Sequence, residues 1–194
     1  TPHMTMSCEM REYLHECIRR YTAVEGAPKL RKAGSPLHEV SPHDYLDARN
    51  QEPGLFRSSC ASLVMSVAYA ARMARPDLLV CVNALSTELT RWSVLSDERL
   101  VKMFAYIQST VDLCQHSVVK IGSTEDWVLH GFADANLGGS DNHTRSVSGS
   151  ILFITDKNST RAALTWASSR QCATATSTAE AELVSLTKYA QQSL

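Results

Sequence analysis

The sequence predicts an α/β protein in which a helical first part is followed by three β-strands and a helix. Two observations predict this order. Apolar residues recur at helical spacing through much of residues 1–116. Residues 117–194 instead contain three short runs rich in β-branched and aromatic residues, separated by turn-forming residues and followed by a return to helical spacing. We therefore expect a helical segment over 1–116 and a β-β-β-α module over 117–194.

The first predicted element is an amphipathic helix over residues 7–22. Its apolar residues recur at helical spacing, namely Met6, Met10, Tyr13, Leu14, Cys17, Ile18 and Tyr21. A polar stretch with little periodicity follows and contains prolines at positions 28, 36, 42 and 53. We interpret this stretch as a long connector that runs over the surface.

Two further helices are expected on either side of the Arg75-Pro76-Asp77 sequence. The residue before a proline is disfavoured in the α conformation, so the earlier helix should end near Ala74. Pro76 suits the opening turn of the next helix, where Asp77 would lie near the positive N-terminal end.

Another helix should begin at Ser96, which is a plausible N-cap residue followed by Asp97 and Glu98 in the first turn. Its buried stripe is expected to be Leu100, Phe104, Ile107 and Val111. Three arginines in these helices, Arg72, Arg75 and Arg91, allow two interpretations. They could line a groove that faces a nucleic-acid backbone, or they could lie on solvated helix faces, which is the commoner arrangement.

The β-rich part contains the runs "WVLHGFAD", "SVSGSILFIT" and "ALTWAS". Short, turn-rich connections separate them, so strands near 127–134, 147–155 and 162–167 should form one antiparallel meander. A helix from about residue 178 should cover one face, with periodicity through Leu183, Leu186 and Ala190. Ser177 and Glu180 fit the capping-box pattern at the start of this helix.

Composition narrows the functional classes. The 194 residues carry a net charge of -1, so a nucleic-acid contact would need a local basic patch. The six cysteines are scattered and form no C-x-x-C pair, which signals neither a zinc site nor a compact disulfide framework. Scattered thiols suit a reducing compartment, and we expect an intracellular protein, cytoplasmic or nuclear. No apolar run is long enough to cross a membrane, so no membrane partner is expected.

Two acidic residues are the candidates for chemistry. Asp134 ends the first predicted strand, although Asp is disfavoured in strands, and Glu182 lies one turn into the last helix. If that helix packs across the sheet, the two carboxylates could converge on a divalent cation such as Mg²⁺. The alternative is that Asp134 starts a turn and Glu182 is a solvated residue near the helix N-terminus.

A resemblance to a known family adds to this interpretation. The blocks "GFADANLGGSDNHTRSVSGSILFI" and "LTWASSRQCATATSTAEAELVSLTKYA" resemble, in order and spacing, the ribonuclease H region of copia-type retrotransposon polyproteins. Upstream, "FRSSCASLVMSVAYAARMARPDLLVCVNALS" is similar to the segment that connects reverse transcriptase to ribonuclease H in that family. The resemblance covers about residues 55–194, with a fainter trace in the first helix.

The resemblance implies a helical connection segment over 1–116 and an incomplete ribonuclease-H-like module over 117–194. It further implies that Asp134 and Glu182 are catalytic residues that bind Mg²⁺ or, in its place, Mn²⁺. Asn136 and Leu137 stand where the family usually has Asp and Trp, and Ala179 replaces Thr. The two later metal-binding aspartates of the family have no counterpart before Leu194, so we expect metal binding by this chain to be weak or absent.

These observations lead to two functional hypotheses. The first is a fragment of a retrotransposon-type reverse transcriptase/ribonuclease H, whose ancestral reaction is metal-dependent hydrolysis of RNA in RNA–DNA hybrids. The second is a non-catalytic, degenerate or domesticated remnant that acts as a scaffold or partner-binding subunit. With two of four expected carboxylates, whether this chain is an enzyme stays open. An incomplete sheet would leave an unpaired edge and an uncovered apolar face, so we expect self-association or a protein partner.

Overall fold

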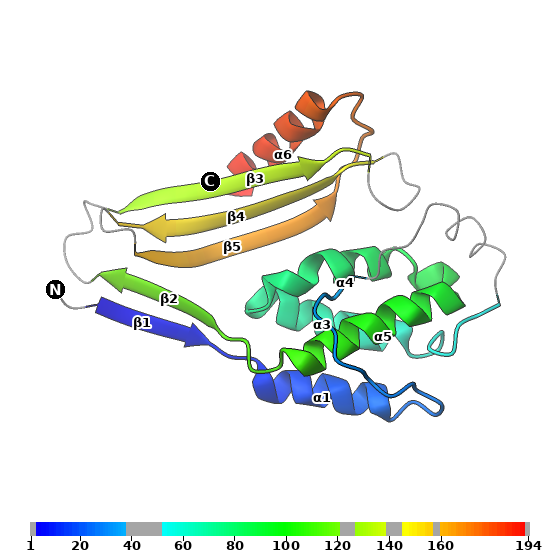
Figure 1. Ribbon diagram of the computed structural model, residues 1–194. Helices are drawn as coiled ribbons and strands as arrows, with labels where there is room; N and C mark the ends of the chain where they lie inside the picture. Colours follow the sequence, from blue (N-terminus) through cyan, green and yellow to red (C-terminus); the bar gives the residue numbers. More distant parts are fainter. Residues whose placement is uncertain (1–2, 38–51, 121–126, 139–144, 157–159, 193–194) are drawn as a thin grey trace. The chain divides into compact units, whose positions relative to one another are not determined.

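The computed structural model describes residues 3–37, 52–120, 127–138, 145–156 and 160–192 (Figure 1). They form a mixed α/β protein, as the sequence predicts, and divide into two compact units. The helical unit is Glu9–Cys114, and the sheet unit combines Thr1–Cys8 with Gln115–Leu194. Parts of the predicted connector and of the loop after the first strand of the meander, 38–51 and 139–144, lie outside the described residues.

Within its described residues, the helical unit contains four α-helices and two 3₁₀-helices. Its elements are α1 (Arg11–Thr22), α3 (Cys60–Met73), the 3₁₀-helix η1 (Pro76–Leu78), α4 (Leu79–Ser86), the 3₁₀-helix η2 (Leu89–Arg91) and α5 (Val94–Ser109). Its core is one apolar cluster in which Tyr21 stacks on Phe56 and Phe104, with ring centroids 5.2 and 4.8 Å apart. Of the predicted α5 stripe, Leu100, Phe104 and Ile107 are fully buried, and Val111 packs partly buried against the cluster.

The break between α3 and α4 lies where proline chemistry places it. Ala74 follows the last residue of α3, which confirms the predicted end of that helix. Pro76 opens η1, a single 3₁₀ turn that runs directly into α4 rather than an α-helical turn. A 3₁₀ turn at a helix start is common, because it satisfies backbone groups over a shorter span.

The beginning of the chain was predicted wrongly. Residues 7–10 are not helical; His3–Cys8 form strand β1, and α1 begins at Arg11. Strand β1 pairs in antiparallel register with β2 (Gln115–Lys120), so that His3 lies opposite Lys120 and Cys8 opposite Gln115. The partner strand follows the whole helical unit in sequence, and a local periodicity of apolar residues carries no information about such a distant pairing.

The start of α5 also differs from the prediction. Ser93, rather than Ser96, is the N-cap, and its hydroxyl accepts a hydrogen bond from the backbone N–H of Ser96. The Ser96 hydroxyl in turn accepts from the Ser93 N–H, which completes a capping box between two serines. The helix therefore starts one turn earlier, and the two serines satisfy each other's backbone donors.

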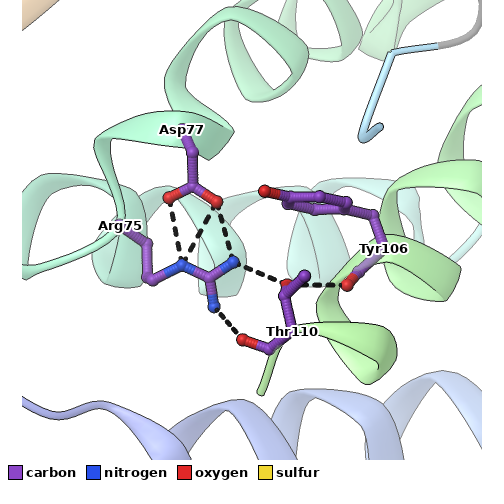
Figure 2. A network of polar contacts seen from close by, with 4 residues as sticks. All are labelled: Arg75, Asp77, Tyr106 and Thr110. Atoms are coloured by element: carbon purple, nitrogen blue, oxygen red, sulfur yellow. Dashed lines mark hydrogen bonds and ion pairs between the residues drawn. The ribbon is translucent and has the colours of Figure 1, made fainter. Parts of the chain in front are cut away.

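Arg75 is a buried structural residue and lies on no solvated helix face. Its side chain is 3% exposed, and its guanidinium donates from Nε and Nη2 to the Asp77 carboxylate at 2.7–3.2 Å (Figure 2). The same guanidinium donates to the backbone oxygen and hydroxyl of Thr110 at 3.0 and 2.8 Å. The ring of Tyr106 lies 5.9 Å from the guanidinium carbon. This network ties the break after α3 to the end of α5.

In the sheet unit, β3 (Val128–Asn136), β4 (Val147–Thr155) and β5 (Arg161–Arg170) form an antiparallel meander in the order β3-β4-β5 (Figure 1). This confirms the predicted topology of the three strands. Strands β1 and β2 form a separate two-stranded sheet, and β2 contacts β5. The register between β4 and β5 shifts between Leu152 and Phe153, as at a β-bulge.

Helix α6 (Thr178–Gln192) covers one face of this meander, mainly over β3 and β4, as predicted. Ala181 and Ser185 of α6 are buried against the sheet, and their small side chains allow the helix to approach the strands closely. Leu183 and Leu186, whose periodicity predicted the helix, are 64% and 55% exposed.

Candidate functional site

Asp134 lies in β3, two residues before the strand ends, and its side chain is exposed. Opposite it in β4 is Gly149. A Cβ atom built at Gly149 would meet no other atom within 4 Å, so the space beside Asp134 is open. An aspartate at this place has room for a ligand on the sheet surface, whereas an aspartate that starts a turn would sit at the strand end.

The strand pleat places Asp134 on the face of the sheet opposite α6. A Cβ atom at Gly131 would lie 1.7 Å from the Tyr189 hydroxyl of α6, so the odd-numbered residues of β3 face that helix. Ala135, also odd-numbered, is buried. Successive side chains in a strand alternate between faces, so Asp134 points away from the helix.

Glu182 is half-buried in the second turn of α6. The orientation of the helix follows from two contacts. Lys188 donates to the Ser169 hydroxyl of β5 at 2.6 Å, whereas Tyr189 lies over Gly131 of β3. Glu182 lies seven residues before Tyr189, two full turns away and on the same side. Glu182 therefore lies along the side of α6 that looks toward β3.

Ser185 attaches the helix of Glu182 to the strand of Asp134. Its hydroxyl donates to the backbone oxygen of Asp134 at 2.8 Å, and Ser185 lies one helical turn after Glu182. The turn of α6 that begins with Glu182 thus rests on the strand segment that carries Asp134. Because their side chains leave from different faces of the sheet, the described structure does not bring the two carboxylates together, and a shared ion would have to lie at the edge of β3 away from β4. Within the described residues, β3 pairs with β4 alone, so this edge carries no strand.

Glu180 has a separate, structural role. Its carboxylate accepts hydrogen bonds from the backbone N–H and the hydroxyl of Thr176, both at 2.7 Å, which lowers the pKa of this carboxyl group. The Ser177 hydroxyl accepts from the Glu180 N–H at 3.2 Å. The capping interaction predicted from the sequence is present, but the glutamate reaches Thr176 rather than Ser177. Glu182 is consequently the acid of this helix that remains for chemistry.

The donor chemistry of the site suits a hard divalent cation, because two carboxylates supply oxygen ligands of the kind that Mg²⁺ prefers. Asn136 follows Asp134 by two residues and shares its face of the sheet, so its amide oxygen could be a further ligand. Among the described residues, no three His, Cys, Asp or Glu side chains gather closely enough to hold a metal by themselves. Asn136 was noted in the sequence only as a departure from the family pattern; its spacing from Asp134 was the signal.

The sequence reasoning missed the character of the surface around Asp134. We define the open face as the side of the β3-β4-β5 sheet opposite α6, with residues His130, Phe132, Asp134, Asn136, Ile151, Phe153 and Trp166. His130 stacks on Phe132 with centroids 4.8 Å apart, and Phe132 meets Phe153 edge-on at 6.3 Å. Phe132 is 50% exposed. The alternation H-x-F-x-D-x-N in β3 was the available signal for this face.

Comparisons with known proteins leave the family unassigned. No protein-family model matches the chain, and no solved structure matches it. In the described part of the chain, none of the helices is both long and apolar enough to span a bilayer.

Proposed function

We propose that this chain is a fragment of a retrotransposon-type reverse transcriptase/ribonuclease H, with Asp134 and Glu182 as two of the ligands of a catalytic divalent cation. The proposal is supported by the order of the family-like sequence blocks and by one observation of geometry. The Ser185 hydroxyl donates a hydrogen bond to the backbone oxygen of Asp134, and this bond holds the helical turn of Glu182 against the strand of Asp134. Glu182 lies on the side of α6 that looks toward β3, the strand that carries Asp134.

In this proposal, Asp134 binds the ion from the open face and Glu182 reaches it around the edge of β3. Asn136 lies beside Asp134 on that face and would orient a water or a phosphate oxygen. A bound Mg²⁺ would supply activation of water and stabilisation of the leaving oxygen in phosphodiester hydrolysis. The substrate is RNA in an RNA–DNA hybrid. Because in-line cleavage by this mechanism uses two ions about 4 Å apart, two carboxylates should give slow cleavage or none.

The test measures Mn²⁺ binding by electron paramagnetic resonance, together with cleavage of a labelled RNA–DNA hybrid. We expect weak Mn²⁺ binding that is lost in Asp134→Asn and in Glu182→Gln. Glu180→Gln is the matched control, because Glu180 is an exposed acid of the same helix that bonds Thr176 instead. Binding that survives in both Asp134→Asn and Glu182→Gln would refute the metal site. Robust cleavage, lost in both variants, would show that the site is complete.

The second candidate is a non-catalytic scaffold or partner-binding subunit, in line with the alternative hypothesis from the sequence. The observation in its favour is the open face, where a half-exposed Phe132 adjoins His130 and Phe153. Exposed aromatic residues that cluster on one surface are typical of interaction sites. Absence of cleavage together with absence of Mn²⁺ binding would favour this second function.

A further inference from the structure

Strand β3 presents an edge that has few of the usual protections against pairing. It is nine residues long, and its sequence VLHGFADAN contains no Lys, Arg or Pro. Its residues Val128, Leu129 and Phe132 are 61%, 54% and 50% exposed. Natural edge strands are commonly shortened, bulged or charged to prevent the addition of another strand. The strand keeps a regular register with β4 from Val128 to Asn136 without a bulge, and Asp134 is its one acidic residue.

The backbone groups on this edge can be assigned from Ser185. Its hydroxyl lies 2.8 Å from the Asp134 oxygen and 3.5 Å from the Gly149 oxygen. Both carbonyl oxygens must therefore lie between the two strands, as in a hydrogen-bonded pair of an antiparallel ladder. Since the direction of these groups alternates along a strand, the even-numbered residues of β3 bond toward β4. The N–H and C=O groups of the odd-numbered residues, from Leu129 to Ala135, point outward along the edge.

We propose that this 194-residue chain forms a homodimer in which β3 pairs antiparallel with β3 of a second copy, centred on Phe132. This register pairs odd-numbered with odd-numbered residues, so the outward backbone groups of the two copies meet. It places Phe132 opposite its own equivalent and His130 opposite Asp134 of the second copy. These are non-hydrogen-bonded pairs, in which the Cα atoms are only about 4.5 Å apart and the side chains are closest.

Charge and chemistry favour a second copy as the occupant. The His130–Asp134 pair occurs twice across the twofold axis, and each pair combines a basic with an acidic side chain. The central Phe132 pair joins the aromatic rows of the two open faces, because Phe132 already contacts His130 and Phe153 in its own sheet. A strand that is complementary to itself in this way suits an isologous C2 interface.

The twofold axis of the proposed dimer also relates the two α6 helices. A twofold axis normal to the sheet keeps both α6 helices on one side of the joined sheet. Leu186 lies four residues after Glu182, on the side of α6 that looks toward β3, and is 55% exposed. The second α6 approaches from that side. The exposed part of Leu186 therefore lies on the side from which the second helix approaches.

Pairing of β3 has a consequence for the candidate metal site, although the dimer does not depend on that site. The second strand occupies the edge around which Glu182 would reach Asp134. Asp134 also takes His130 of the second copy as its neighbour. The dimer is therefore a form in which the two carboxylates are kept apart.

The test is sedimentation velocity of the full chain over a range of concentrations. We expect a concentration-dependent dimer, and a monomer for Phe132→Lys, which would place two ammonium groups opposite each other. Leu164→Lys is the matched control: Leu164 is 52% exposed on β5 of the same sheet, away from the β3 edge, and its variant should remain dimeric. Circular dichroism verifies that each variant is folded.

A charge exchange tests the register independently. His130→Glu should give a monomer, because each glutamate would face Asp134 of the second copy, and the double variant His130→Glu/Asp134→Lys should restore the dimer. A monomeric wild type, a dimer that survives Phe132→Lys and His130→Glu, or a dimer that Leu164→Lys dissociates would each overturn the proposal. These measurements report mass alone, so their failure is distinguishable from a failure of the metal site, which Mn²⁺ binding reports.

Discussion

The Ser185 hydroxyl donates a hydrogen bond to the backbone oxygen of Asp134 at 2.8 Å, from a side chain that is 1% exposed. This contact fixes the position of α6 on β3. A larger residue would lift the helix from the strand, and an apolar one would lose the bond. The relationship between Glu182 and Asp134 therefore depends on a serine that carries no catalytic chemistry of its own.

We predict that Ser185→Ala lowers the free energy of unfolding by about 1 kcal/mol, the usual net contribution of one hydrogen bond. Urea titration followed by circular dichroism measures this change. Thr187→Ala is the control, because the Thr187 side chain is exposed and bonds only within its helix, to the Leu183 oxygen at 2.8 Å. Its effect should stay within about 0.5 kcal/mol. Equal effects of both substitutions would contradict a special role of Ser185.

Two glycines in neighbouring strands should respond oppositely to alanine. At Gly131 a Cβ atom would lie 1.7 Å from the Tyr189 hydroxyl, so Gly131→Ala should destabilise the fold by about 1–3 kcal/mol. At Gly149 nothing lies within 4 Å of a Cβ atom, and replacing a strand glycine should be neutral or stabilising. Thermal unfolding of both variants distinguishes them. Adding Tyr189→Ala to Gly131→Ala should recover part of the loss, and strict additivity would argue against this contact.

Arg75 should be among the costliest residues to replace. Its buried guanidinium pairs with Asp77 and bonds Thr110, as Figure 2 shows. Hydrogen bonds to a charged group contribute about 1.5–3 kcal/mol, and Asp77 is 32% exposed and can be hydrated once Arg75 is gone, so Arg75→Ala should lower the unfolding free energy by about 2–3 kcal/mol. Arg75→Lys should recover only part of it, because an ammonium lacks the planar fork of donors. Arg72→Ala, at an exposed arginine of the same helix, should change little, and a comparable loss there would contradict the network.

The Asp97 carboxylate should hold the loop before α3 in place. It accepts hydrogen bonds from the backbone N–H of Leu55, the backbone N–H of Phe56 at 3.2 Å and the indole of Trp92 at 2.6 Å. Asp97→Asn replaces one acceptor with an amide donor that faces these N–H groups, and should cost about 2 kcal/mol. Glu98→Gln, at the adjacent exposed acid, is the control. Chemical denaturation compares the two, and an unchanged midpoint for Asp97→Asn would contradict this assignment.

Stability should fall in alkaline solution. Burial raises the pKa of the Tyr21 hydroxyl to about 12, with a smaller contribution from Asp97, and burial together with Glu88 raises that of the Cys81 thiol to about 12. The unfolded chain releases these protons from about pH 9 to 10, so the folded state binds more protons there and loses stability as pH rises toward 12. Urea midpoints measured across this range should decrease. Tyr21→Phe should flatten the decline, and a midpoint independent of pH would refute the prediction.

Much of the fold could be predicted from local sequence. The end of α3 at Ala74 follows from proline sterics, and the order of β3, β4 and β5 follows from short connections that leave an antiparallel pairing as the available arrangement. The capping role of Glu180 also followed from local spacing, although its hydrogen-bond partner is Thr176. Each of these features depends on residues that lie within a few positions of one another.

The start of α5 shows the limit of local patterns. Ser93 and Ser96 are both good caps, and the sequence alone favoured Ser96 because two acids follow it. The structure uses Asp97 to bind Leu55, Phe56 and Trp92, so its role is tertiary and not that of a first-turn charge. An aspartate can act either as a first-turn charge or as an acceptor for distant backbone groups, and sequence spacing does not distinguish these two roles.

By itself, the sequence determined the classes of elements, most of their order, and Asp134 and Glu182 as the acids to consider. Only the tertiary structure decided that Arg75 is buried and that Leu183 and Leu186 are exposed. It also decided that β1 pairs with β2, a strand that follows the whole helical unit in sequence. It also placed Asp134 on the open face and Glu182 on the side of α6 that looks toward β3. The physical reason is that propensity and capping act over one or two turns of chain, whereas burial and strand pairing depend on contacts between residues far apart in sequence.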